Sequence, residues 1–237
     1  MTAAPRRRAA LADGDSPPRL ALALPVRDAA ARLPDALLAI AAWCARARTP
    51  LEVLVVDDGS VDGTATVAEA FRRRLPWLRV LRHAEPRGPG AALRTAFQAT
   101  RATVVVFGDA DLDAPVEQLP RLLAAVVEGA DVAVATPGDV AAPPAAGLAR
   151  AARALSAGVR RLVPAGLRAV PRGWKALRLR TAKRLCAAAE SDGYDVDADW
   201  RFLAKRLGAR VVETPVPRRT APARGARRAP APVDVDD

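Results

Sequence analysis

The strongest restriction on the fold of this chain comes from short apolar runs that alternate with segments of helical periodicity. Five runs precede residue 136, at residues 19–24, 51–56, 78–81, 103–107 and 131–135. They lack the apolar-polar alternation of half-exposed strands, which indicates strands buried on both faces of a sheet. Between them apolar residues recur at helical spacing. This alternation predicts βαβ units, hence an α/β fold with a mainly parallel central sheet flanked by helices.

Beyond residue 135 the pattern becomes less regular. A Pro/Ala-rich loop is predicted first, and the elements expected after it are a helix at 148–162, a strand at 173–178, a helix at 181–189, a helix around Trp200 and a last strand at 211–213. Residues 1–18 and 218–237 are rich in Pro, Ala and Arg without apolar periodicity, which predicts disordered tails. We therefore expect a single domain over residues 19–217.

Composition narrows the classes of function. The formal net charge is +11, which suits phosphorylated substrates, anionic lipid or nucleic acid as partners. His83 is the only histidine, which argues against a zinc site, and Cys44 and Cys186 sit in helical patterns typical of buried thiols. No apolar run approaches the roughly 18–20 residues of a membrane span, and no secretory signal is visible. These features predict a cytoplasmic protein, with at most peripheral electrostatic contact with the membrane.

Two acidic clusters follow two of the predicted strands. Asp57 and Asp58 end the second apolar run, and Asp109 and Asp111 come directly after the fourth. Ligands of parallel sheets bind beyond the carboxyl ends of the strands. A 3-2-1-4 strand order would separate the two tips by two strand spacings, about 10 Å, which is the reach of a nucleoside. Pro25, at the end of the first run, would lie between them.

The chemistry of crowded carboxylates favours a divalent cation. Mg²⁺ or Mn²⁺ prefers oxygen ligands together with substrate phosphates, so Asp109 and Asp111 are predicted to bind a metal that carries a diphosphate. Asp57 and Asp58 can accept hydrogen bonds from base N–H groups or ribose hydroxyls. The alternative reading is that acids in these loops are turn and cap residues, most plausibly Asp62 and, outside the two pairs, Asp113.

Several motifs in order resemble those of family 2 glycosyltransferases, which have the GT-A (Rossmann-like) fold. Within residues 19–217 the closest similarity is to the branch of dolichyl- and polyprenyl-phosphate mannose or glucose synthases. The motifs read VVDDGSVDGT at 55–64, RGPGAALR at 87–94, FGDADL at 107–112, GYDVDAD at 193–199 and LAKRLG at 203–208.

The resemblance assigns roles to individual residues. Asp57 and Asp58 fall on the acids that bind the nucleoside, and Asp109 and Asp111 fall on the DxD acids that bind metal and diphosphate. Arg94 falls on a basic position of the family. The expected nucleotide-sugar site therefore consists of Pro25, Asp57, Asp58, Arg94 and Asp109. The expected metal site consists of Asp109 and Asp111.

The resemblance also implies a reaction, the metal-dependent, inverting transfer of a hexose from UDP- or GDP-hexose to an acceptor such as a polyprenyl phosphate. Lys175 and Arg178 are candidates for holding an acceptor phosphate. Where the acceptor is a hydroxyl, a carboxylate must remove its proton, and Asp197 or Asp199 is the candidate base. Trp174 is either a sugar-stacking platform or part of the core.

Some positions depart from the family pattern and keep alternatives open. Ala29 replaces a nucleotide-facing Glu, Pro89 replaces a Lys, and Asp199 replaces a Glu. A catalytically weakened nucleotide-sugar-binding scaffold of the same fold is therefore the alternative function. A specific nucleic-acid binder is disfavoured because Tyr194 is the only tyrosine for base stacking. A dinucleotide oxidoreductase is disfavoured because the glycine fingerprint is absent.

Overall fold

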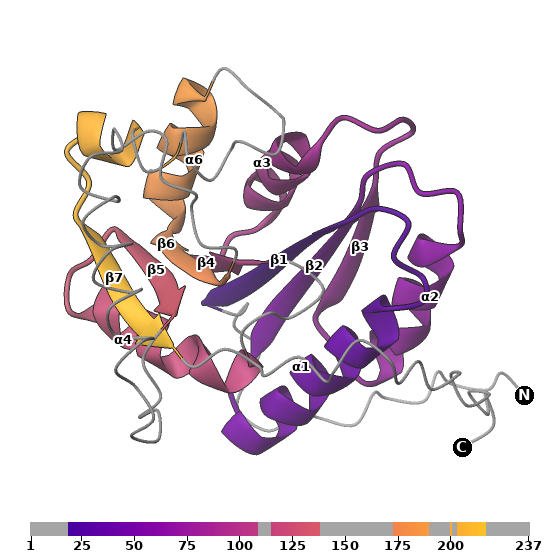
Figure 1. Cartoon of the computed structure of the whole chain (residues 1–237). Helices are drawn as coiled ribbons and strands as arrows, with labels where there is room; N and C mark the ends of the chain where they lie inside the picture. Colours follow the sequence, from indigo (N-terminus) through magenta and orange to yellow (C-terminus); the bar gives the residue numbers. More distant parts are fainter. Residues whose placement is uncertain (1–18, 109–114, 138–172, 190–199, 201–202, 217–237) are drawn as a thin grey trace, which may run out of the picture.

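The computed structural model describes residues 19–108, 115–137, 173–189, 200 and 203–216, and it contains one seven-stranded sheet (Figure 1). The order of strands across the sheet is β3-β2-β1-β4-β6-β5-β7. The strands are β1 (Leu20–Val26), β2 (Leu51–Asp57), β3 (Leu78–Arg82), β4 (Val104–Phe107), β5 (Val132–Pro137), β6 (Lys175–Arg178) and β7 (Val211–Val216). The predicted tails and the helix expected at 148–162 lie outside the described residues.

The first four strands are parallel and confirm the predicted order 3-2-1-4. Leu20 pairs with Leu51 of β2 on one side and with Val104 of β4 on the other. In the second half, β6 runs antiparallel between β4 and β5, and β7 is parallel to β5. The predicted α/β architecture with a mainly parallel sheet is therefore confirmed.

Helices cover both faces of the sheet. On one face lie α1 (Leu33–Ala47), α2 (Thr64–Ala70) and α4 (Leu119–Val127), and on the other lie α3 (Pro89–Ala99) and α6 (Leu179–Ala188) (Figure 1). Alternate residues of β2 supply the two apolar cores, because successive side chains of a strand point to opposite faces. Leu51, Val53 and Val55 pack in the core between the sheet and α1, which we call the α1 core. Leu54 and Val56 pack in the core between the sheet and α3, which we call the α3 core.

Several strands run further than the sequence predicted, and two of them continue through a proline. β1 continues through Pro25 to Val26, and β7 continues through Pro215 to Val216. Proline has no backbone N–H, so it cannot donate a hydrogen bond to a neighbouring strand. Pro215 lies on β7, which is an edge strand with a neighbour on one side only. Pro25 lies beyond Ala23, the last residue of β1 that pairs with β4. Neither proline therefore has to donate a hydrogen bond to a second neighbouring strand.

Both cysteines are free thiols within the described helices, as predicted. Cys44 is partly buried on α1, and Cys186 is buried on α6. Burial raises the pKa of Cys44 to about 11. Among the helices of the described residues, none has the length and apolar character needed to cross a membrane.

Candidate functional site at the carboxyl edge of the sheet

Asp57 is a buried carboxylate at the last position of β2. It stands in register with Val26 of β1 and Arg82 of β3. Its Oδ1 accepts a hydrogen bond of 2.9 Å from the backbone N–H of Ser60. Its Oδ2 is buried and accepts no hydrogen bond from the described residues, although Nε of Arg82 lies 3.3 Å away. A buried polar atom without a hydrogen-bonding partner is uncommon and calls for an explanation.

Asp58 is also buried, but its carboxylate is fully engaged by the protein. Oδ1 accepts hydrogen bonds from Nδ1 of His83 at 2.7 Å and from the N–H of Arg87 at 2.8 Å, and Oδ2 accepts one from the N–H of Gly88 at 2.8 Å. Burial acts to raise the pKa of Asp58, but these hydrogen bonds outweigh it and hold the pKa below its ordinary value. Asp58 is therefore a stable anion.

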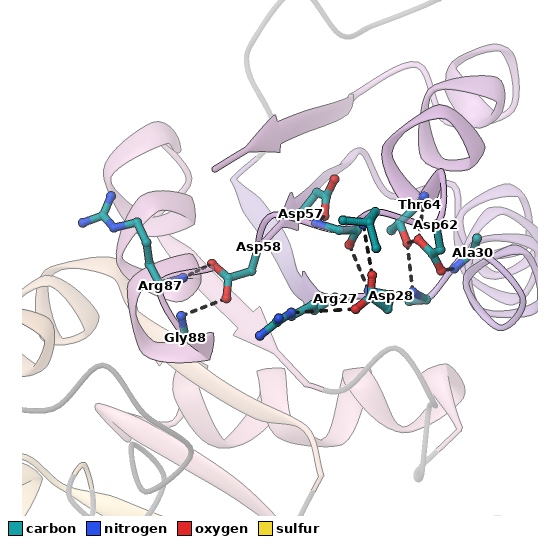
Figure 2. A network of polar contacts seen from close by, with 12 residues as sticks. Arg27, Asp28, Ala30, Asp57, Asp58, Asp62, Thr64, Arg87 and Gly88 are labelled. Carbon is teal, nitrogen blue, oxygen red and sulfur yellow. Dashed lines mark hydrogen bonds and ion pairs between the residues drawn. The ribbon is translucent and has the colours of Figure 1, made fainter. Parts of the chain in front are cut away.

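The two adjacent acids have separate surroundings. Figure 2 shows the Asp58 side chain directed toward Arg87 and Gly88, away from the contacts of Asp57. The N–H groups of Arg87 and Gly88, at the start of α3, would otherwise suit an anion. Because Asp58 accepts from both of them, this glycine-rich loop does not offer them to a phosphate in the structure.

The loops that follow β1 and β2 are joined by reciprocal hydrogen bonds (Figure 2). The backbone N–H of Asp28 donates to Oγ of Ser60 at 2.9 Å, and Oδ1 of Asp28 accepts from the N–H of Val61 at 3.1 Å. The N–H of Ala29 donates to the buried hydroxyl oxygen of Thr64 at 2.8 Å. These bonds fix the segment after Pro25 beside Asp57.

Asp62 completes this connection as a turn residue, whereas the N-cap position of α2 is occupied by Gly63 and not by Asp62. Its carboxylate accepts hydrogen bonds from the N–H of Ala30 at 2.9 Å and from the N–H of Thr64 at 3.0 Å. Hydrogen bonds from the Thr64 hydroxyl and the Ala30 N–H lower the pKa of Asp62. Asp62 therefore supports the loops without facing a ligand site.

Gly59 allows the loop after β2 to pack closely against the loop before α3. Its φ of +70° is a conformation that favours glycine, and a Cβ there would lie 2.8 Å from the backbone nitrogen of Pro86. Any larger residue would push these two loops apart.

His83 is a buried member of the site that sequence reasoning missed. It follows β3 directly, and its backbone N–H donates to the carbonyl of Asp57 at 2.9 Å. Its ring nitrogens contact Asp58 and Oγ1 of Thr95 on α3, the latter at 2.9 Å. The available signal was its position: it comes directly after a predicted parallel strand, at the same sheet edge as the acids.

The three basic residues predicted for the site, Lys175, Arg94 and Arg178, lie in different places relative to the acidic edge of the sheet. Lys175 is buried at the carboxyl edge, in register with Phe107, with Nζ 5.3 Å from the ring centroid and 3.2 Å from the carbonyl of Gly173. Arg94 lies on α3, and its Nη2 is 3.4 Å from the carbonyl of Cys186 on α6. Both lie on elements that border the site or pack beside it.

Arg178 lies at the other end of β6, in register with Val104 at the beginning of β4. Its guanidinium donates to the carbonyl of Val126 in the last turn of α4 at 2.9 Å and to the carbonyl of Ala130, which follows that helix, at 3.3 Å. The structure does not bring Arg178 to the acidic edge. Its contact with an acceptor stays a prediction that the geometry does not favour.

β4 reaches the same sheet edge as β2, where the chain leads toward the predicted metal ligands. Gly108 follows β4 and packs against Trp174, which is buried in the α1 core and so takes the core reading over the stacking platform. The predicted metal ligands and bases Asp109, Asp111, Asp197 and Asp199 lie outside the described residues. Among the residues that are described, no cluster of three His, Cys, Asp or Glu could hold a metal.

Comparison with known proteins places this geometry in a family. Residues 22–144 match the family described as glycosyl transferase family 2. An undecaprenyl-phosphate mannosyltransferase of Micrococcus luteus is 34% identical over 172 residues, which cover 70% of this chain and 70% of that protein. The chain belongs to glycosyl transferase family 2, as its motifs predicted.

Other relatives match over a smaller share of their length. An undecaprenyl-phosphate 4-deoxy-4-formamido-L-arabinose transferase of Pseudomonas savastanoi is 33% identical over 115 residues, and the match covers 48% of this chain and 34% of that protein. The chain thus spans about a third of the length of that transferase.

Solved structures confirm the GT-A fold. A mannosyltransferase from Pyrobaculum calidifontis, in complex with GDP-Man and Mn²⁺, superposes with a TM-score of 0.61 at 22% identity, covering 89% of this chain and 59% of that one. A glucosyl-3-phosphoglycerate synthase from Mycobacterium tuberculosis, in complex with UDP, gives a TM-score of 0.55 at 22% identity and covers 89% and 73% of the two chains.

Proposed function

We propose that this chain is an inverting glycosyltransferase that moves a hexose from a nucleotide diphosphate sugar to an acceptor. The observation that carries the proposal is the buried Oδ2 of Asp57 at the carboxyl edge of β2, beside the loop that follows β1. This oxygen accepts no hydrogen bond from the described residues and has the Arg82 guanidinium 3.3 Å away. Parallel sheets bind ligands at this edge. Membership of family 2 supplies the reaction class.

The pairing of Asp57 with Arg82 suits a particular kind of base. An acceptor oxygen and a guanidinium donor lie 3.3 Å apart. Uracil and guanine each present an N–H beside a C=O, a donor and an acceptor that complement this pair. The Arg82 side chain is 61% exposed, and its Nη2 donates to the carbonyl of Ser60 at 3.0 Å, which holds the guanidinium beside Asp57. This supports UDP- or GDP-hexose as the donor.

Asp58 has a different role in this proposal. Its carboxylate is occupied by three donors from the protein, so it anchors the glycine-rich loop and α3 beneath the nucleotide. Arg94 on the same helix is proposed to contribute positive charge on the diphosphate side. Asp57 is then the acid that meets the nucleoside directly.

The leaving diphosphate needs charge compensation. Carboxylate oxygens are hard donors that suit Mg²⁺ or Mn²⁺, and Asp109 and Asp111 are the residues proposed to hold it. A bound divalent ion would neutralise negative charge that develops on the diphosphate. Lys175, buried beside Phe107 at the same edge, adds a fixed positive charge near the end of β4.

A polyprenyl phosphate is the proposed acceptor, by analogy with the name of the Micrococcus relative. A phosphate acceptor is already ionised and needs no strong general base. Asp197 and Asp199 are proposed as bases only where the acceptor is a hydroxyl. Such a lipid acceptor implies peripheral contact with the cytoplasmic face of a membrane through the cationic surface.

Donor binding is the first experiment. The full chain is screened by thermal shift and calorimetry with UDP-, GDP-, ADP- and CDP-hexoses, with and without Mn²⁺. A ligand that binds only the folded state raises the melting temperature. Asp57→Asn is expected to weaken binding of the best donor by about tenfold or more, the loss of one hydrogen bond to a charged group. Glu128→Gln, the same loss of charge at an exposed site at the end of α4, is the control.

The proposed metal site is tested in a separate experiment. Asp109→Asn combined with Asp111→Asn is expected to abolish the Mn²⁺-dependent part of donor binding without changing the melting temperature of the ligand-free protein. Unchanged affinity in this double variant would refute the metal role. No shift with any nucleotide in the wild type would refute the function itself.

A nucleotide-sugar-binding scaffold is the second candidate, and a local observation favours it. Ala29 stands where the family has a nucleotide-facing Glu, and its backbone N–H is committed to Thr64. A scaffold would bind the donor without releasing nucleotide diphosphate in the presence of a polyprenyl phosphate. Turnover measured by nucleotide release distinguishes the two functions.

A further inference from the structure

His83 links three parts of the donor edge through one imidazole ring. It follows β3, is 7% exposed, and lies between the Asp58 carboxylate after β2 and the Thr95 hydroxyl on α3. The ring nitrogens are 2.7 Å from Oδ1 of Asp58 and 2.9 Å from Oγ1 of Thr95. Both nitrogens of a buried histidine are therefore engaged.

The partners determine where the ring carries its proton. The backbone N–H groups of Arg87 and Gly88 both donate to the Asp58 carboxylate, one to each oxygen, so this group is held as an ionised acceptor. Nδ1 of His83 must therefore be the N–H that donates to Asp58. In the neutral ring, Nε2 is then the acceptor, and the hydroxyl of Thr95 donates to it. The two hydrogen bonds therefore run in the same direction: the Thr95 hydroxyl donates to His83, and His83 donates to Asp58.

We propose that His83 is a positioning residue of the donor site, which fixes the Asp58 carboxylate and thereby the start of α3. This inference rests on the proposed function. Asp58 in turn holds the N–H groups of Arg87 and Gly88, so the position of the glycine-rich loop depends on the direction in which the carboxylate points. His83 need not touch the nucleotide for this effect.

The removal of His83 leaves a definite defect. Oδ1 of Asp58 keeps the Arg87 N–H but loses the ring N–H of His83, and the hydroxyl of Thr95 loses its hydrogen bond to His83. A carboxylate held by fewer donors samples more rotamers. The loop that it anchors is then less well ordered for ligand binding.

Substitutions that each replace one end of the ring test the proposal. The amide nitrogen of asparagine reaches the position of Nδ1, whereas the amide nitrogen of glutamine reaches that of Nε2. His83→Asn is expected to keep donor affinity within about threefold of wild type, and His83→Gln and His83→Ala to weaken it about tenfold, the loss of one hydrogen bond to a charged group. Thr95→Val, which spares the Asp58 contact, should resemble His83→Asn.

Calorimetry with UDP and GDP, on variants whose folding is verified by urea denaturation, measures these affinities. If glutamine matched wild type while asparagine did not, the assigned orientation would be overturned. If wild type bound and His83→Ala bound equally well, the positioning role would be overturned while the proposed function stood. If wild type bound no nucleotide, the proposed function would fail first.

A second readout is independent of nucleotide. Because the chain has one histidine, ¹⁵N-histidine labelling gives the nitrogen signals of a single imidazole. Nδ1 is expected to carry the proton in the ligand-free protein at every pH at which it is folded, and this signal should be lost or shifted in Asp58→Asn. A neutral ring protonated at Nε2 instead would overturn the inference.

Discussion

Gly108 and Trp174 touch so closely that the first has no room for a side chain. A Cβ on Gly108 would lie 2.6 Å from Cε3 and 2.9 Å from Cζ3 of the buried indole. Gly108→Ala is therefore expected to lower the free energy of unfolding by about 1–3 kcal/mol, as overpacking of a core does. Because Gly108 follows β4, donor affinity should also fall. Urea denaturation and calorimetry measure the two effects.

Gly173→Ala provides the matched control for this prediction. The nearest atom to a Cβ there is the Cβ of Ala135, at an ordinary contact distance of 3.7 Å. Its effect on the free energy of unfolding should be within about 0.5 kcal/mol, as for substitutions without a clash. Equal destabilisation by both substitutions would contradict the packing explanation.

The hydroxyl of Thr64 is expected to stabilise the joined loops. It is fully buried and accepts from the N–H of Ala29 at 2.8 Å. Thr64→Val keeps the shape but leaves that N–H without an acceptor, which costs about 1–3 kcal/mol of unfolding free energy. Thr64→Ser keeps the oxygen and should lose clearly less. A valine variant as stable as wild type would contradict the role of the hydroxyl.

The free energy of unfolding should depend on pH through the ionisation of Asp58. Its pKa is lowered from an ordinary 3.8 in the folded protein. Below that ordinary value the unfolded chain takes up a proton on this carboxyl while the folded chain still does not, so stability falls as the pH falls. The contribution is complete above about pH 4 and disappears as the pH drops through the folded pKa.

Asp58→Asn isolates this contribution, because the exposed acids with lowered pKa, Asp62 and Glu69, remain in both proteins. The free energy of unfolding, measured by urea denaturation between pH 5 and pH 3, should fall less steeply in the variant. Parallel curves for the two proteins would mean that Asp58 does not gain its charge stabilisation on folding.

Cys44 should react slowly in the folded protein. Burial raises its pKa to about 11, and only the thiolate attacks maleimides or disulfides. Relative to a free thiol of pKa about 8.5, the thiolate fraction at pH 7.5 is lower by roughly three hundredfold. Labelling followed by mass spectrometry, in a Cys186→Ala background, should be slow until urea unfolds the chain. Fast native labelling would show that α1 opens readily there.

The sequence was sufficient for the first half of the sheet because that half is built from local βαβ units. Each of β1 to β4 coincides with an apolar run, and the right-handed crossover rule leaves few orders for them. β6 was predicted as a strand, but its place between β4 and β5 was not. That place depends on pairing between residues far apart in sequence, which periodicity does not encode.

The candidate site was predicted in location but not in its internal bonding. Asp57 and Asp58 read alike in the sequence, yet one has an oxygen that accepts no hydrogen bond from the described residues and the other accepts from three donors. The difference arises because consecutive residues at a strand end face different helices. Arg178 illustrates the same limit, since the antiparallel direction of β6 puts it at the opposite edge from Lys175.

The insertion of β6 beside β4 also sets an order of assembly during synthesis. β3, β2, β1 and β4 can associate once residue 107 has left the ribosome, but the outer edge of β4 waits for Lys175–Arg178. β5 emerges earlier than β6 yet pairs only with β6 and β7. The nascent chain therefore exposes the outer edge of β4 for about 70 residues of elongation, and an exposed strand edge is prone to pair with other chains.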